Sequence, residues 1–169
     1  MKNPLDFKII SFDEKIERAS FDCREEALND YLKKYAKNNH KKGIGKTFLL
    51  IDSSKSLAGY YTVSMAEILY ENLPEQSRKK LPRYPLPAMR IGRLAVDLKY
   101  QGLGLGGRLL VDALRRAINL FDDIGIYSVL VDAKNESAVH FYEHYGFIRF
   151  SDRSNTLFLP IETILKAFT

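Results

Sequence analysis

A glycine-rich segment between a strand-like stretch and a helix-like stretch is the feature that most constrains this chain. Gln101 to Gly107 reads Gln-Gly-Leu-Gly-Leu-Gly-Gly, and it separates β-rich Ala88 to Asp97 from amphipathic Leu103 to Phe121. Glycines in such a turn let backbone N–H groups approach an anion, and the following helix adds the positive end of its dipole. The segment therefore predicts a phosphate or pyrophosphate site, with a plain strand-to-helix turn as the alternative.

Two better-known nucleotide motifs do not fit this segment. Gly102, Gly104 and Gly107 match the dinucleotide-binding pattern G-x-G-x-x-G. That pattern requires an acidic residue at the carboxyl end of the next strand, where it binds a ribose. Asp122 and Asp123 instead precede the next predicted strand. The lysine followed by serine or threonine that a P-loop needs is also missing.

The spacing of apolar residues along the chain predicts an α/β (α+β) fold. Helices are predicted for Arg24 to Asn38, Leu103 to Phe121 and Glu136 to His144. The predicted strands are Leu5 to Ile10, Thr47 to Asp52, Leu57 to Met65, Ala88 to Asp97, Ile126 to Asp132, Phe147 to Phe150 and Thr156 to Leu159. A strand–helix–strand unit that follows antiparallel strands indicates a mixed sheet, and the length of 169 residues suits one domain over 1–169.

The region around the first predicted helix carries three further expectations. Asp22 stands where an N-cap would, and Glu25 three residues on completes a capping-box-like pattern. The basic stretch Lys37 to Lys46 predicts a flexible segment. Cys23 is the one cysteine, so a disulfide framework is excluded and a reducing compartment is favoured. A small buried residue fits Cys23 better than a catalytic thiol does, because the sequence shows no partner histidine.

The last predicted helix offers two candidate chemistries. His140 to His144 reads H-x-x-E-H, the string of one class of zinc enzyme. A zinc site needs a third ligand and the helix ends at once, so two exposed histidines are favoured and no metal is expected. Tyr142 lies in the same segment. A phenol has an ordinary pKa near 10 and can protonate a leaving thiolate, whereas packing beside Phe141 and Phe147 is the alternative.

Together these segments resemble the GNAT family of N-acetyltransferases. The resemblance rests on Arg93-Leu94-Ala95-Val96-Asp97, Gln101 to Gly106, Asn135, Phe141-Tyr142 and Tyr145-Gly146-Phe147. It implies a mixed central sheet of about six or seven strands flanked by helices, with acetyl-CoA as co-substrate and no metal. The residues that it implies for acetyl-CoA binding are Leu94, Ala95, Val96, Gln101, Gly102, Leu103, Gly104, Leu105, Gly106, Gly107, Asn135 and Tyr142.

The same resemblance implies a role for each of these groups. The backbone of the strand Leu94-Ala95-Val96 would contact the pantetheine and the acetyl carbonyl. The glycine loop would hold the pyrophosphate, and Asn135 would contact the pantetheine arm. Tyr142 would be the catalytic acid that protonates the coenzyme A thiolate.

A wider resemblance covers nearly the whole chain and is to the toxin branch of the family. It rests on Phe21-x-Cys23, Tyr60 to Ser64, the proline loop Leu81 to Pro87 and Gly92 to Asp97. Members of this branch acetylate aminoacyl-tRNA, which blocks translation, and are paired with a ribbon-helix-helix antitoxin. Many form homodimers. One departure is Arg24, where the branch usually has glycine.

The residues of the central strand favour an acceptor amine that is easily deprotonated. A lysine amine has a pKa of about 10.4 and needs a carboxylate base, whereas an α-amino group has a pKa of about 7.7–8.0. Met89 to Val96 contains no acidic residue, and Asp97 comes only at its end. Glu67 and Glu71 remain candidates for a base that acts through water. The missing base fits an aminoacyl ester better than a lysine.

The net charge of +5 is unevenly distributed along the chain. Residues 33–93 hold thirteen Lys/Arg and four Asp/Glu, a local charge of +9, while 1–32 carry −3 and 94–169 carry −1. Such a surface suits an RNA backbone. The residues predicted to contact tRNA are Lys41, Lys42, Lys46, Arg78, Lys79, Lys80, Arg83, Arg90 and Arg93. Tyr60, Tyr61, Tyr70 and Tyr84 are predicted to stack bases. The alternatives are a solvated basic face or a grip on the 3′-phosphate of coenzyme A.

These observations predict an acetyl-CoA-dependent N-acetyltransferase of the cytoplasm, a toxin that acetylates the α-amino group of aminoacyl-tRNA. A protein N-terminus, a polyamine or a small amine is the alternative acceptor. A non-catalytic module that binds coenzyme A or an antitoxin is the alternative of another class. No run of about 18 apolar residues is present, so no membrane-spanning segment is expected.

Overall fold

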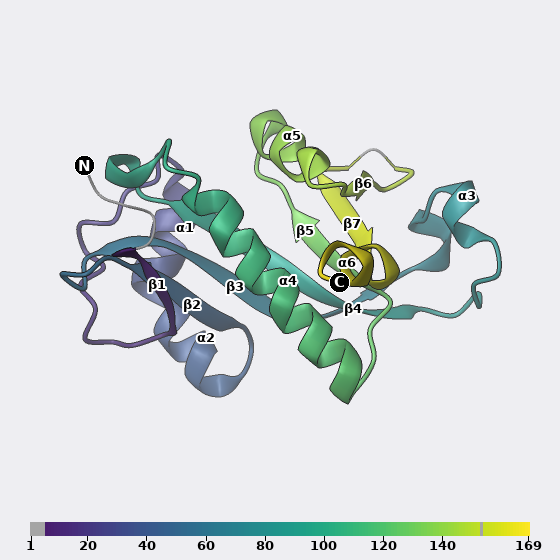
Figure 1. The fold of residues 1–169 in the computed structure, drawn as a ribbon, viewed down its shortest axis with the longest axis horizontal. Coiled ribbons are helices and arrows are strands. Elements are labelled where there is room, and N and C mark those ends of the chain that lie inside the picture. The colour runs from purple at the N-terminus through teal and green to yellow at the C-terminus, as the bar shows by residue number, and fades with distance from the viewer. Residues whose placement is uncertain (1–5, 153) are drawn as a thin grey trace. The chain divides into compact units, whose positions relative to one another are not determined.

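Seven strands form one mixed sheet in the order β1-β2-β3-β4-β5-β7-β6 (Figure 1). The computed structural model describes residues 6–152 and 154–169. The strands are β1 (Lys8–Ser11), β2 (Lys46–Ile51), β3 (Leu57–Ile68), β4 (Leu86–Val96), β5 (Ser128–Asp132), β6 (Ile148–Arg149) and β7 (Thr156–Pro160). β4 and β5 pair in parallel, whereas β1–β2, β2–β3, β5–β7 and β6–β7 are antiparallel. The predicted mixed sheet, with antiparallel strands before a strand–helix–strand unit, is confirmed.

Six α-helices and three short helical turns are described in the same residues. The α-helices are α1 (Glu26–Asp30), α2 (Ala36–Lys42), α3 (Glu75–Arg78), α4 (Leu105–Asp123), α5 (Glu136–His144) and α6 (Ile161–Ala167). The turns are η2 (Tyr31–Tyr35, π-helical), η3 (Tyr70–Asn72) and η4 (Leu98–Tyr100). None of the described helices is both long and apolar enough to cross a membrane.

Several predicted boundaries differ from the observed ones. The first strand runs over Lys8–Ser11 rather than from Leu5, which lies outside the described residues. The helix α6 was not predicted; its seven residues follow β7 directly, with Pro160 as the N-cap. The chain divides into two compact units, each built from two segments. Unit 1 comprises residues up to Ser64 with Arg93–Ala113, and unit 2 comprises Met65–Gly92 with Leu114–Thr169.

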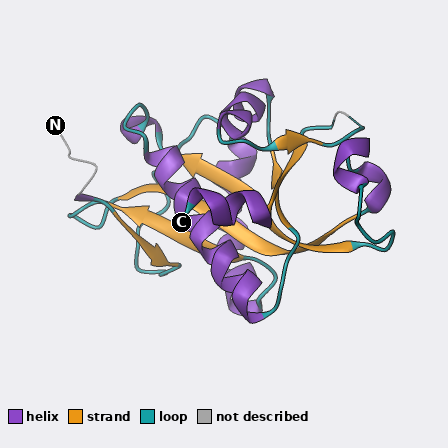
Figure 2. Ribbon diagram, turned by 45° about the vertical axis from the view of Figure 1, so that its right-hand side comes forward, coloured by secondary structure: helices purple, strands orange, loops and turns teal. Residues whose placement is uncertain are grey.

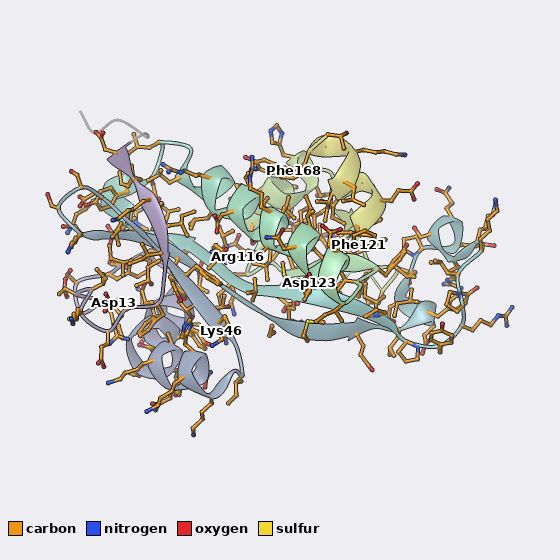
Figure 3. The ribbon with its side chains drawn as sticks, turned by 60° about the horizontal axis from the view of Figure 1, so that its bottom comes forward. Asp13, Lys46, Arg116, Phe121, Asp123 and Phe168 are labelled. Atoms are coloured by element: carbon orange, nitrogen blue, oxygen red, sulfur yellow. The ribbon has the colours of Figure 1, made fainter. Side chains whose placement is uncertain are left out.

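In unit 1, helices cover both faces of β2 and β3. Side chains that alternate along a strand point to opposite faces. Leu49 and Tyr60 pack with Leu28 and Leu32 from the first helical segment. On the other face, Tyr61 donates a hydrogen bond of 2.5 Å to Asp112 of α4. Figures 1 and 3 show α1 and α2 on one side of these strands and the first half of α4 on the other.

The first helical segment of unit 1 corrects two expectations. The helix continues to Lys42, so part of the stretch predicted to be flexible is helical. Asp22 does not cap it, because the N-cap is Glu25, without a side-chain bond. The Asp22 carboxylate instead accepts hydrogen bonds from Arg24 N–H and Asn29 Nδ2 in the preceding turn. Arg24 has φ +72°, a left-handed conformation that favours glycine.

Gly59 of β3 permits a close approach to β4 in unit 1. A Cβ built on Gly59 would lie 2.8 Å from the carbonyl oxygen of Ala95 and 3.1 Å from Cδ1 of Leu109. Both neighbours lie in the core, so we expect Gly59→Ala to lower the free energy of unfolding by about 1–3 kcal/mol, as overpacking does. Urea denaturation would measure it. Gly45→Ala is the matched control, because its nearest neighbour would be 3.6 Å away, and an equal loss there would contradict the argument.

Unit 2 has its own core between β4, β5 and β7. Ile68, Leu73, Leu130, Phe150 and Phe158 form one buried cluster. β4 and β5 are in register from Ala88 with Ser128 to Ile91 with Val131. Figure 2 shows α3 beyond the ends of the long strands, joined to them by loops. The segment between β3 and β4 is therefore a loop that carries the turn η3 and the short helix α3.

Candidate active site

The glycine loop of unit 1 forms a left-handed turn directly before α4. Gly102 has φ +82° and Gly104 has φ +76°, and no atom lies within 4 Å of a Cβ built on either. Both glycines are therefore required by the backbone, and the space beside them is open. Arg108 N–H donates the first helical hydrogen bond, to Gly104 O. The backbone N–H groups at the start of α4 that precede Arg108 have no hydrogen-bond acceptor within the helix. This is the arrangement in which a helix N-terminus binds phosphate.

Strand β4 ends next to this loop, and the loop is tied to it. Asp97 N–H donates to Ala58 O, so residues 95 and 97 turn their backbone groups toward β3. Leu94 and Val96 therefore present theirs at the other edge. Gln101 Nε2 donates to Val96 O at 2.9 Å, while β4 pairs with β5 only as far as Ile91. This geometry favours Leu94 and Val96 over Ala95 as backbone partners for a ligand.

Asp97 is a structural residue of the same turn. It is 4% exposed, and its carboxylate accepts hydrogen bonds from the backbone N–H groups of Asp22 and Lys99. Leu98 N–H in turn donates to Asp22 O. Asp97 thus holds the loop before α1 against the end of β4.

In unit 2, Tyr142 lies on the buried side of α5. Its side chain is 5% exposed and packs edge-on against Phe141 and Phe147. Burial, with a smaller contribution from the negative charge of Asp132, raises the pKa of the Tyr142 phenol above its ordinary value near 10. The phenol is therefore protonated at neutral pH and can act only as a proton donor. The aromatic packing anticipated as an alternative is present as well.

Asn135 begins helix α5. It is the N-cap, and its Oδ1 accepts a hydrogen bond from Ala138 N–H at 2.9 Å. This side chain fixes the start of the nine-residue helix that carries Tyr142. The predicted contact of Asn135 with a pantetheine arm is additional to this capping role.

The acidic residues of unit 2 that could act as a base fall into two kinds. Glu67 and Glu71 are exposed. Asp132, at the end of β5, forms an ion pair with Arg90 at 2.5 Å and accepts a hydrogen bond from Thr156. Among the described residues, no group of three His, Cys, Asp or Glu side chains could hold a metal ion.

The nine basic residues predicted to contact tRNA divide into those engaged within the protein and those facing solvent. Arg90 pairs with Asp132, Arg93 lies over the ring of Tyr31, and Arg78 Nε donates to Leu73 O. Lys46 Nζ donates to His40 O but remains exposed. The remaining exposed members are Lys41, Lys42, Lys79, Lys80 and Arg83.

Two of the four tyrosines predicted to stack bases cannot do so. Tyr60 and Tyr61 are 0% exposed, because helices cover both faces of β3 in unit 1. Tyr60 donates a hydrogen bond to Leu28 O, and burial raises the pKa of its phenol. Tyr84 is 67% exposed, and Tyr70 lies under Arg78 and Arg83. Sequence reasoning missed Tyr35, which is 56% exposed although its spacing predicts a core position.

Comparison with known proteins identifies the family. The sequence model of the acetyltransferase (GNAT) domain matches residues 19–157. A tRNA-acetylating toxin of Mycobacterium tuberculosis is 37% identical over 128 residues, which cover 76% of each chain. The structure of AtaT complexed with acetyl-methionyl-tRNAfMet is similar, with a TM-score of 0.89, 32% identity, and coverage of 97% of this chain and 100% of that one.

A second solved structure shows a related assembly. An AtaT mutant bound to acetyl-CoA and to the C-terminus of the antitoxin AtaR matches with a TM-score of 0.82 and 28% identity, covering 97% of this chain and 99% of that one. Because the domain match spans most of the chain, the predicted resemblance is confirmed, and this protein belongs to the GNAT family of acetyltransferases.

Proposed function

We propose that this protein transfers the acetyl group of acetyl-CoA to the α-amino group of an aminoacyl-tRNA. The observation that carries the proposal is the likeness, over nearly the whole of both chains, to AtaT in complex with acetyl-methionyl-tRNAfMet. The local charge of +9 over residues 33–93 supports an RNA acceptor. As a toxin, the protein would block translation by this reaction.

Each unit holds groups to which the resemblance assigns a role toward acetyl-CoA. In unit 1, the N–H groups at the start of α4 and the turn at Gly102 and Gly104 would hold the pyrophosphate, and Leu94 and Val96 would orient the pantetheine. In unit 2, Asn135 would contact the pantetheine arm and Tyr142 would protonate the leaving thiolate. The bound co-substrate supplies the activated thioester.

The proton balance of the reaction suits an α-amino acceptor. A neutral amine attacks the thioester carbon, the amide forms as the C–S bond breaks, and Tyr142 gives its proton to the thiolate. The proton that the amine loses passes to water, and the Tyr142 phenolate regains a proton from water. A phenol with a raised pKa is a weak acid, but a desolvated thiolate is also a stronger base, so the transfer from Tyr142 stays feasible. The amine needs little help to lose its proton, because an α-amino pKa is about 7.7–8.0.

The remaining parts of the proposal concern partners and place. We infer one catalytic domain over residues 1–169, a ribbon-helix-helix antitoxin as partner, a homodimer, and action in the cytoplasm. The likeness to AtaT bound to the C-terminus of its antitoxin supports the partner. Coexpression with the reading frame next to this gene, followed by copurification, would test it.

Transfer of radiolabelled acetyl from acetyl-CoA would test the proposed acceptor. The purified protein would be incubated with a mixture of aminoacyl-tRNAs, with deacylated tRNA, with a peptide bearing a free N-terminus, and with a polyamine. We expect label only in aminoacyl-tRNA, and loss of the label when the ester is hydrolysed. Label in the peptide or polyamine instead would support the alternative acceptor, and acetyl-CoA binding without transfer to any amine would support a non-catalytic module.

The pH dependence of this reaction is a further prediction. Because burial raises the pKa of Tyr142, the phenol stays protonated to higher pH than an ordinary tyrosine. The value of kcat/KM for aminoacyl-tRNA should therefore rise as the α-amino group loses its proton, with a midpoint at or below about 8. No fall should follow up to about pH 9.5. Initial rates in buffers of constant ionic strength would measure this, and a decline below pH 9 would contradict Tyr142 as the donor.

A further inference from the structure

In unit 1, one exposed tyrosine stacks on a second tyrosine that is buried. Tyr35 is 56% exposed, although most large apolar side chains of this unit are buried. Its ring stacks on Tyr31, with 6.2 Å between the ring centroids and 29° between the ring planes. Tyr31 itself is 6% exposed. The arrangement leaves part of one aromatic ring available to a ligand while its neighbour is fixed.

Three features hold this pair in place. The π-helical turn η2 separates the tyrosines by one wide helical turn and places Tyr35 outside the apolar face that its spacing predicts. The guanidinium of Arg93, on β4, lies 3.5 Å from the centroid of the Tyr31 ring. Asn39 Nδ2 donates a hydrogen bond to the Tyr31 hydroxyl. A π-helical turn is rare and frequently marks a functional site.

The surface around Tyr35 is strongly basic. Exposed lysines from the same helical segment and from the start of β2 surround it in sequence: Lys33, Lys34, Lys37, Lys41, Lys42 and Lys46. Lys34 pairs with Asp30 and Lys37 with Glu14, which leaves a large excess of positive charge on this segment. Figure 3 shows Lys46 beside the helix α2, whose side chains extend into solvent. A planar ring within such a surface suits a nucleic acid base attached to an anionic backbone.

We propose that Tyr35 is a stacking platform for an unpaired nucleobase of the acceptor RNA. The inference rests on the proposed function, because it assumes an RNA acceptor. Tyr31 and Arg93 are positioning residues, since they hold the platform rather than contact the base. The predicted contact of Arg93 with RNA is additional to this positioning role, because a ring that lies against the face of a guanidinium leaves the N–H groups in its plane able to donate.

Steady-state kinetics of three variants would test the platform. We expect Tyr35→Ala to raise the KM for aminoacyl-tRNA by about tenfold, a change within the range measured for a base–aromatic stack. The kcat and the KM for acetyl-CoA should not change, and Tyr35→Phe should restore the wild-type KM because it keeps the ring. Phe121→Ala is the matched control, because Phe121 is 36% exposed at the acidic end of α4, beside Asp123 (Figure 3). It should behave as wild type.

A second measurement distinguishes failure of the proposed base stacking at Tyr35 from failure of the proposed aminoacyl-tRNA acceptor. An RNA acceptor stem with 2-aminopurine in its single-stranded 3′ end loses fluorescence when that base stacks. We expect quenching by the wild type and by Tyr35→Phe, and not by Tyr35→Ala. If the wild type acetylates aminoacyl-tRNA while Tyr35→Ala has the same KM and quenches equally, the platform is wrong and the function stands. If the wild type acetylates no aminoacyl-tRNA, the proposed function fails, and this quenching alone decides the platform.

Discussion

Replacing Tyr142 by phenylalanine should lower kcat for aminoacyl-tRNA acetylation by about 10²–10⁴-fold, the contribution typical of a general acid. The substitution removes one hydroxyl and keeps the ring that packs against Phe141 and Phe147. Because Tyr142 is 5% exposed and its packing is preserved, the fold and the acetyl-CoA affinity should change little. The loss would therefore appear in kcat and not in the Kd of acetyl-CoA.

Two measurements separate this chemical role from a structural one. Single-turnover acetylation gives the rate of the chemical step, and isothermal titration with acetyl-CoA gives the Kd. Tyr127→Phe is the matched control, because Tyr127 is a partly buried tyrosine of unit 2 whose pKa is also raised by burial. It should retain the wild-type rate. A Tyr142→Phe enzyme with unchanged kcat would show that another group, or water, protonates the thiolate.

Local sequence patterns predicted the elements that carry this chemistry. The helix Glu136 to His144 was predicted with its observed bounds, and Gly146 with positive φ marks its end. The turn before α4 was predicted for the same reason, since glycines with positive φ leave a direct trace in the sequence. The first helix was predicted only in part. Its apolar spacing gives no sign of the π-helical turn, which depends on how Tyr31 packs under Arg93.

Contacts between distant segments could not be predicted in the same way. Arg90 was expected to bind RNA, yet it pairs with Asp132 from a neighbouring strand, a partner 42 residues away in the chain. Tyr60 and Tyr61 point to opposite faces of β3, so one of them would be exposed if only one face were covered. Both are buried because helices cover both faces. The sequence pattern of one strand does not show whether other elements cover one or both of its faces.

Replacing Gly104 by valine should raise the Kd of acetyl-CoA by at least about tenfold. Gly104 has φ +76°, a conformation that costs a residue with a side chain about 1–2 kcal/mol. The valine loop would relax away from this turn in the free protein, so binding would have to restore it, and 1.4 kcal/mol corresponds to tenfold in Kd. A β-branched side chain is disfavoured further. The valine would also fill the open space beside the N-terminus of α4, where we propose that the pyrophosphate binds.

Gly43→Val provides the matched control for this substitution. Gly43 ends α2 with φ +74°, and no atom lies within 4 Å of a Cβ built on it. The two variants therefore carry the same backbone strain and should lose similar free energy of unfolding, which thermal denaturation would measure. Only Gly104→Val should lose acetyl-CoA affinity, because Gly43 has no place in the proposed site. Equal affinities of the two variants for acetyl-CoA would show that the pyrophosphate does not bind at the glycine turn. The glycines of that turn would then have a purely structural role.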